Sequence, residues 1–304
     1  MKASFIRRFG GPEVLEYGEL PDPAPAAGEV LVDIHAASVN AADWKMRGGH
    51  YGSTIAFPHV PGRDFSGVIA KGGRDFRPGD AVFGVCEVPR EGAYAEKITI
   101  REAIVARKPE RLTHVQTAAI ALIGLTALVS IEDTLKLKRG ETILIQGGAG
   151  GVGGFAIALA KHIGARVITT ASAANHAYVR KLGADEVIDY KAQDFTKLVK
   201  GVDAVFDTVG GDVTMKSFAV LRPSGRLASV AVGGAPASPR PDVLSLRPKV
   251  DRDRAHLDRV AALVTQGAVP VPEITEYPLA RAADAHRVSE SRHLRGKLVL
   301  RVRE

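Results

Sequence analysis

The chain has 304 residues, of which 45% are hydrophobic and 25% charged, values ordinary for a globular protein with room for two domains. Its net charge of +7 is spread among interleaved acids, so a solvated surface and an anionic cofactor explain it better than nucleic acid does. We see no run of about eighteen apolar residues and no apolar leader, so we expect no membrane span and a cytoplasmic location. The single cysteine, Cys86, excludes an intramolecular disulfide and a multi-cysteine zinc site.

The first third of the chain predicts short strands separated by glycine and proline turns. A short helix, Ala41–Arg47, is expected directly after Asn40, and a longer helix at 115–131 ends this part. Short strands with this punctuation indicate a compact, barrel-like β domain. The expected strands are residues 2–8, 14–20, 30–37, 65–71, 81–86 and 94–100.

The middle of the chain is organised around a glycine-rich turn. An apolar run suited to a buried strand, residues 143–146, precedes the turn, and a small-residue helix ending at Gly164 follows it. The spacing Gly148-x-Gly150-x-x-Gly153 matches the dinucleotide-binding fingerprint. In that fingerprint glycines make the tight turn, let the backbone approach a pyrophosphate and allow close helix–strand packing, and the helix N-terminus offers N–H groups to phosphate.

Strands and helices alternate after this turn, which predicts a parallel, doubly wound sheet with ligands at its carboxyl edge. The expected strands are 166–170, 186–189, 202–207 and 226–232, and the helices are 173–182 and 212–221. Residues 233–247 read as a loop. Helices at 257–266 and 281–289 and strands at 269–275 and 297–302 follow. We expect residues 123–267 to form a nucleotide-binding domain inserted in a β domain of residues 1–122 and 268–304.

Further motifs occur along the whole chain. They include Phe9-Gly10-Gly11-Pro12, Asn40-x-x-Asp43-x-Lys45, Pro61-Gly62-x-Asp64, Gly124-Leu125-Thr126, Asp207-Thr208-Val209-Gly210 and Gly296-Lys297-Leu298. These motifs resemble those of the zinc-independent, quinone oxidoreductase-like (zeta-crystallin-like) branch of the medium-chain dehydrogenase/reductases, although Ala158 departs from the quinone reductase signature, which usually has Gln there. The resemblance implies an α/β fold, with a Rossmann sheet inserted in a GroES-like β-barrel catalytic domain. It also implies transfer of hydride from NADPH to a quinone or an α,β-unsaturated carbonyl.

The sequence favours NADPH over NADH. No Asp or Glu occurs between Gly148 and Ala184, where NAD-specific proteins carry an acid for the ribose. Ser172 offers a hydroxyl to the 2′-phosphate, although it also suits a helix N-cap. The resemblance implies that Tyr190 and Arg292 reach the same phosphate; simple packing and a solvated turn are the alternatives. Further cofactor contacts implied are Thr126, Gly148, Ala149, Gly150, Gly151, Val152, Gly153, Val209 and Val232.

We expect no metal site. A catalytic zinc needs about three ligands from Cys, His and acids, and zinc-dependent relatives use a Cys and a Gly-His-Glu motif. This chain has Asp43 near the first position and Gly62-Arg63-Asp64 in place of the second. The resemblance places Asn40 and Tyr51 beside the nicotinamide as hydrogen-bond donors for the reacting oxygen. The alternatives are a helix N-cap and a packed aromatic, and Asp43 and Lys45 read as a charge pair.

Two other functions are weighed against the reductase. The alternative is an NADPH-binding sensor or interaction protein with little turnover. A nucleic-acid-binding role lacks support, because no clustered basic stripe with interleaved aromatics occurs. The resemblance further implies a homodimer that joins the edge strands of two nucleotide-binding sheets, and we expect the segment around residues 226–232 and the loop that follows it to lie at that edge.

Overall fold

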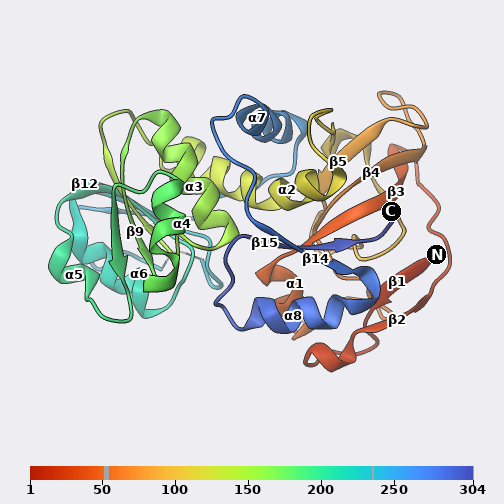
Figure 1. The fold of residues 1–304 in the computed structure, drawn as a ribbon, viewed down its shortest axis with the longest axis horizontal. Coiled ribbons are helices and arrows are strands. Elements are labelled where there is room, and N and C mark those ends of the chain that lie inside the picture. Colours follow the sequence, from red (N-terminus) through yellow and green to blue (C-terminus); the bar gives the residue numbers. More distant parts are fainter. Residues whose placement is uncertain (51–54, 235, 304) are drawn as a thin grey trace. The chain divides into compact units, whose positions relative to one another are not determined.

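The computed structural model describes residues 1–50, 55–234 and 236–303. The chain forms two compact units, and the elements of both are labelled in Figure 1. The first unit comprises Met1–Leu122, Arg252–Thr265 and Glu273–Glu304, and the second comprises Ile123–Asp251 and Gln266–Pro272. The expected α/β class, with a parallel Rossmann sheet and a separate β-rich domain, is confirmed.

The first unit is built on a seven-stranded sheet with the order β14-β15-β3-β4-β5-β7, and β6 also pairs with β3. Its pairs are antiparallel except for β14 with β15, which are parallel. A separate hairpin joins β1 (Lys2–Phe5) to β2 (Glu16–Glu19), as expected. The sheet strands are β3 (Glu29–Val39), β4 (Asp64–Lys71), β5 (Ala81–Val85), β6 (Lys97–Arg101), β7 (Val105–Arg107), β14 (Ile274–Pro278) and β15 (Lys297–Arg301).

Three helices accompany this sheet: α1 (Ala41–Arg47), α7 (Arg254–Thr265) and α8 (Ala282–Glu290). Helix α8 packs beside α1 (Figure 1), so the C-terminal part of the chain contacts the segment that follows β3. The unit also contains the short 3₁₀ turns Pro12–Val14, Glu102–Ile104 and Leu279–Arg281. The strand expected at 269–275 begins later, at Ile274, because Pro270 and Pro272 cannot donate to a ladder.

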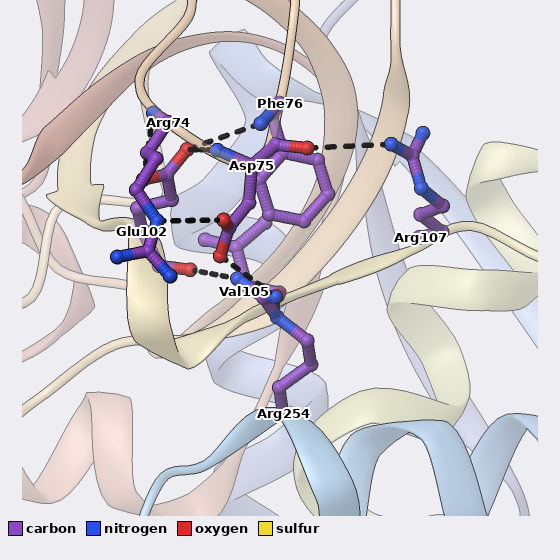
Figure 2. Close-up of polar contacts among 7 residues, drawn as sticks. All are labelled: Arg74, Asp75, Phe76, Glu102, Val105, Arg107 and Arg254. Carbon is purple, nitrogen blue, oxygen red and sulfur yellow. Dashed lines mark hydrogen bonds and ion pairs between the residues drawn. The ribbon is translucent and has the colours of Figure 1, made fainter.

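Helix α7 corrects the predicted domain boundary, because it belongs to the first unit and not to the nucleotide-binding domain. Figure 2 shows the reason: Arg254, the first residue of α7, is bound to the β domain. Its guanidinium donates to the carbonyl oxygens of Val105 (2.9 Å) and Glu102 (3.0 Å) and to Asp75 (3.0 Å). The Arg254 guanidinium also lies 4.9 Å from the ring centroid of Phe76.

The second unit contains a six-stranded sheet with the order β10-β9-β8-β11-β12-β13, in which all neighbouring strands are parallel. Its strands are β8 (Thr142–Gln146), β9 (Arg166–Ala171), β10 (Glu186–Asp189), β11 (Val202–Asp207), β12 (Leu221–Ser229) and β13 (Leu244–Leu246). Its helices are α3 (Gly151–Ile163), α4 (His176–Lys181), α5 (Phe195–Leu198) and α6 (Asp212–Ser217). The predicted alternation is therefore confirmed.

Strand β13 was expected to be loop, and it changes the sheet edge. Residues 244–246 pair in parallel with Arg226–Ala228 of β12, so β12 is an inner strand and residues 226–232 are not the edge. The edge strand β13 lies in the segment that follows them, which was the second part of the expectation. A three-residue strand in a Pro- and Ser-rich segment has too short an apolar run to be recognised by periodicity.

One long apolar helical stretch runs from the first unit into the second. It consists of α2 (His114–Leu128), which continues as a π-helical turn, Val129–Thr134. Contrary to our expectation, His114–Thr134 is long and apolar enough to cross a membrane by length and composition alone. Because 83% of its most apolar window is buried in the protein, it has the character of a core helix.

Candidate functional site

The glycines of the turn between β8 and α3 differ in the space around them. A Cβ added to Gly148 would clash with Oγ1 of Thr169, and one added to Gly153 would clash with the carbonyl oxygen of Gly147. At Gly150 an added Cβ would meet that same oxygen only at 3.6 Å, an ordinary contact. The outer two glycines therefore allow close packing, whereas the middle one leaves room for a ligand. These residues fit a dinucleotide cofactor.

Buried hydrogen bonds fix this turn to its neighbours. The hydroxyl of Thr170 donates to the side-chain oxygen of Gln146 (2.7 Å) and accepts from the N–H of Gly147 (3.1 Å). The amide nitrogen of Gln146, a buried residue, donates to Ser217 on α6 (3.2 Å). The ends of β8 and β9 are thus held together at the start of the turn, which keeps its backbone in one conformation.

The loop after β11 is held by a buried carboxylate. Asp207 accepts hydrogen bonds from the N–H groups of Val209 (2.9 Å) and Gly210 (3.2 Å) and from the hydroxyls of Ser229 (3.1 Å) and Thr214. A buried carboxylate with this many donors is fully compensated for the loss of water. Asp207 therefore positions Val209, whose side chain remains 50% exposed.

The predicted cofactor residues of this unit lie after the carboxyl ends of adjacent strands. Ser172 follows β9, Tyr190 follows β10, Val209 lies two residues beyond β11 and Val232 three residues beyond β12. The structure therefore brings them to one edge of the sheet, where ligands of this fold bind. Tyr190 and Val232 are about as exposed as Val209, at 49% and 52%.

Ser172 occupies the N-cap position that was its alternative role, before the turn Ala173–Asn175. The side-chain amide of Asn175 donates to its Oγ (3.2 Å), which leaves the Ser172 hydroxyl proton for another acceptor. Ala149, Gly151 and Val152 lie in the turn and first turn of α3, and Thr126 lies on α2. The Ser172 side chain makes no capping hydrogen bond to the backbone of this turn, and its role toward the 2′-phosphate stays a prediction.

A second cluster of polar groups lies in the first unit, where β3 leads into α1. Asn40 precedes α1 and is 8% exposed. Its side-chain nitrogen donates to Oδ1 of Asp64 (2.9 Å), and its side-chain oxygen accepts from Nζ of Lys297 (2.7 Å). Asn40 is therefore held between a buried acid and a buried ammonium. The role of Asn40 as a hydrogen-bond donor to substrate stays a prediction. Tyr51, the second predicted donor, lies outside the described residues.

Asp64 and Lys297 compensate one another in this cluster. Burial raises the pKa of Asp64, and the charge of Lys297 acts in the opposite direction. Burial lowers the pKa of Lys297, against which Asp64 and then Asp43 act. Asp64 also accepts from Ser38 (2.7 Å) and from the N–H of Leu122 (3.0 Å). Among the described residues no group of three or more His, Cys, Asp or Glu is arranged to hold a metal.

Asp43 has partners that sequence reasoning missed. Its Oδ2 accepts from the N–H of Asn40 (2.8 Å) and from the hydroxyl of Tyr94 (2.9 Å). Burial raises the pKa of Asp43 to about 7, and the neighbouring charge of Asp64 adds to this effect. The expected pair with Lys45 is not formed in the described part of the chain, because Lys45 lies over the ring of Trp44, with Nζ 5.4 Å from its centroid.

Comparisons with known proteins agree with this architecture. The family described as "Alcohol dehydrogenase GroES-like domain" matches residues 26–110, and "Zinc-binding dehydrogenase" matches residues 182–300. The NADPH-dependent alkenal/one oxidoreductase of Arabidopsis thaliana is 33% identical over 99% of this chain and 79% of its own length. A Mycobacterium tuberculosis mycocerosic acid synthase-like polyketide synthase is 30% identical over 98% of this chain, which spans only 15% of that protein.

Solved structures give the same result over the full length. The quinone oxidoreductase from Coxiella burnetii superposes with a TM-score of 0.94, at 35% identity, and covers 100% of this chain and 99% of its own. A mycobacterial protein complexed with NADPH has a TM-score of 0.89 at 32% identity, over 99% of this chain and 100% of its own. The chain therefore belongs to the medium-chain dehydrogenase/reductases, in their quinone oxidoreductase-like branch.

Proposed function

We propose that this protein is an oxidoreductase that uses NADPH to reduce a quinone or an α,β-unsaturated carbonyl compound, without a metal. The observation that carries the proposal is the glycine turn, in which Gly150 leaves space while Gly148 and Gly153 are closely packed. Relatives named as a quinone oxidoreductase and an NADPH-dependent alkenal/one oxidoreductase support the same chemistry.

The choice of NADPH follows from the end of β9. The strand ends at Ala171 and is followed by Ser172, so no carboxylate stands there to repel a 2′-phosphate. The Ser172 hydroxyl is a suitable donor, and Tyr190, half exposed after the next strand, is a second candidate. A solved relative in complex with NADPH supports this assignment.

The protein's own part in the reaction is orientation and stabilisation of charge. NADPH, when bound, supplies the hydride. As a conjugated carbonyl is reduced, negative charge develops on its oxygen, and a hydrogen-bond donor there lowers the barrier. We propose Asn40 and Tyr51 for this task. Lys297 and Asp64 hold the Asn40 amide in a single orientation, and its nitrogen also lies 3.3 Å from the carbonyl and hydroxyl oxygens of Ser38, so a substrate oxygen would have to replace or share these acceptors.

The experiment is steady-state consumption of NADPH with a small panel of quinones and enones. Turnover with several members supports the reductase. Tight NADPH binding without turnover of any member would favour the alternative, a sensor or interaction protein that binds NADPH. An Asn40→Ala variant that kept the full wild-type kcat would remove Asn40 from the mechanism.

We also propose a cytoplasmic homodimer. The edge of the Rossmann sheet is β13, and its Leu244 is 55% exposed, so a paired edge in a second copy would cover it. Light scattering at micromolar concentration tests the dimer, and a charged substitution, Leu244→Lys, should shift it toward monomer. A strict monomer for the wild-type protein would contradict this proposal.

A further inference from the structure

Two cations lie close to the ring of Trp44 in the first unit. Nζ of Lys45 lies 5.4 Å from the ring centroid, and Cζ of Arg292 lies 5.8 Å from it. Trp44 and Lys45 are on α1, whereas Arg292 follows α8, so segments distant in sequence meet at this ring. Trp44 itself is only 9% exposed. The ring thus forms a buried platform with positive charge on it.

The positive charge at this place is not balanced within the described residues. Burial lowers the pKa of Lys45, and the two charged groups that add to the effect, Arg292 and Arg63, are both cations. No hydrogen bond or ion pair joins Lys45 or Arg292 to an acid in the part of the chain that the structure describes. The Arg63 charge is shared with Glu91, whose carboxylate is 3.3 Å away, and Glu91 also faces His59 (3.4 Å).

One further observation points to a ligand. Nε1 of Trp44 is a buried donor with no hydrogen-bond partner among the described residues, and such groups ordinarily have one. The available groups are all donors, which excludes a cation as the ligand.

We infer that Trp44, Lys45 and Arg292 form a binding site for the carboxylate of an anionic conjugated carbonyl substrate. Carboxylate and phosphate share the oxygen acceptors that guanidinium and ammonium groups recognise. An anion there would also remove the repulsion between Lys45 and Arg292. The identity of this ligand as a substrate rests on the proposed reductase function, whereas anion binding itself does not.

The single tryptophan of the chain is Trp44, so intrinsic fluorescence reports directly from this site and requires no turnover. The probes are inorganic phosphate, adenosine 2′,5′-bisphosphate, trans-4-oxo-2-pentenoate and the methyl ester of that acid. The acid and its ester are both enones and differ in one negative charge. We expect saturable fluorescence changes with anions, and binding of the ester at least about tenfold weaker than that of the acid, as one charged hydrogen bond implies.

The variants are Lys45→Gln and Arg292→Gln, with Lys71→Gln as a control that removes one exposed charge elsewhere in the same unit. Each site variant should weaken anion binding by about ten- to a hundredfold, and the control should not. A loss confined to the acid assigns the site to a substrate carboxylate. A loss confined to the bisphosphate would leave Arg292 with only the cofactor phosphate that the resemblance implies, and would overturn the substrate site. Variants that bind every anion as the wild type does would overturn the inference.

The ratio of kcat/KM for the acid to that for its ester, measured with NADPH, completes the test. If the carboxylate is the ligand, this ratio should fall in both site variants. A general loss of activity lowers kcat/KM for both substrates and leaves the ratio unchanged. A wild type that binds the acid but reduces neither enone contradicts the proposed reductase and leaves the anion site standing. A wild type that reduces both equally well, and binds no anion at Trp44, contradicts only the anion site.

Discussion

The hydroxyl of Tyr94 donates a 2.9 Å hydrogen bond to Oδ2 of Asp43 inside the first unit. Nε2 of His286 lies 3.1 Å from the same hydroxyl oxygen, and Nδ1 of His286 lies 3.0 Å from a guanidinium nitrogen of Arg47. Arg47 can only donate, so Nδ1 accepts and Nε2 carries the proton that is donated to Tyr94. The donors are therefore all directed toward Asp43.

Replacing Tyr94 with Phe removes the last donor of this series and leaves the ring in place. We expect the free energy of unfolding to fall by roughly 1–3 kcal/mol, the cost of a lost hydrogen bond to a buried acceptor. The pKa of Asp43 is about 7, so the loss should be larger at pH 8.5, where the carboxylate is charged, than at pH 5.5. Urea unfolding at both pH values measures it, and equal losses would contradict a charged acceptor.

Two histidines, the buried His286 and the partly buried His114, predict a loss of stability in acid. Burial lowers the pKa of His286 to about 3, and the charge of Arg47 adds to this effect. Burial lowers the pKa of His114 to about 4, with smaller contributions from His35, stacked on it at 4.4 Å, and from Lys108. Both folded pKa values lie below the ordinary 6.5. The unfolded chain therefore takes up protons first as the pH falls.

The stabilisation from these neutral histidines is thus present above about pH 6.5 and is lost as the pH falls through about 4 and 3. Unfolding free energies at pH 7, 5.5 and 4.5 should decrease in that order. A His114→Gln variant should show a shallower decrease, whereas His162→Gln, a change at an exposed helix residue, should follow the wild type. Parallel pH curves for all three proteins would refute the role of His114.

The sequence contains the local signals of this fold but not its long-range partners. Gly148, Gly150 and Gly153 could be interpreted because their spacing within one turn reflects a backbone requirement. Tyr94 and His286 could not be assigned to Asp43, because they are 51 and 243 residues away along the chain and meet it only after β3, α1 and α8 have packed. Neither hydrophobic periodicity nor spacing encodes such a meeting.

The same limit explains why helix α7 was assigned to the wrong domain. Its amphipathic pattern predicted a helix correctly, but the pattern does not say which sheet the helix covers. That choice depends on Arg254, whose partners Asp75, Glu102 and Val105 are about 150 to 180 residues earlier in the sequence. The predicted charge pair of Asp43 and Lys45 was wrong for a related reason. Side chains two residues apart on a helix point in different directions.

Two glycines of the turn should respond differently to alanine. Gly153→Ala places a Cβ against the carbonyl of Gly147 and 3.0 Å from Cα of Gly148. The backbone must move to make room, so the free energy of unfolding should fall by about 1–3 kcal/mol. Gly150→Ala meets only an ordinary contact and has an allowed φ of −74°, so the fold should tolerate it. The Cβ of Gly150→Ala should nevertheless fill the space for the pyrophosphate.

Thermal unfolding and NADPH affinity, measured on both variants, separate these effects. Gly150→Ala should keep the wild-type melting temperature and lose at least about tenfold in affinity, which corresponds to roughly 1.4 kcal/mol. Wild-type NADPH affinity in a stably folded Gly150→Ala protein would show that the turn does not approach the cofactor.

Metal removal should leave the reaction intact. Asp64, at the position where zinc-dependent relatives have the Glu of their Gly-His-Glu motif, is already engaged by Ser38, Asn40 and the N–H of Leu122, with Lys297 as its counter-charge. Incubation with 1,10-phenanthroline or EDTA should therefore leave NADPH-dependent turnover unchanged. Stoichiometric zinc in the purified protein, together with activity lost to the chelator and restored by zinc, would contradict this expectation.

A carboxylate at position 172 should reverse the cofactor preference. Ser172 is partly exposed and occupies the N-cap position after β9, where Asp is as well tolerated as Ser. The variant Ser172→Asp adds a negative charge where the 2′-phosphate of NADPH is proposed to lie, and it offers an acceptor to the ribose hydroxyl of NADH. The variant Ser172→Asn is the matched control, because it has nearly the same shape and capping ability as Asp without the charge.

We expect Ser172→Asp to lose NADPH affinity by about ten- to a hundredfold and to gain affinity for NADH. The control Ser172→Asn should change both affinities little. Equal effects of Asp and Asn on the two cofactors would mean that position 172 shapes the loop and does not face the phosphate.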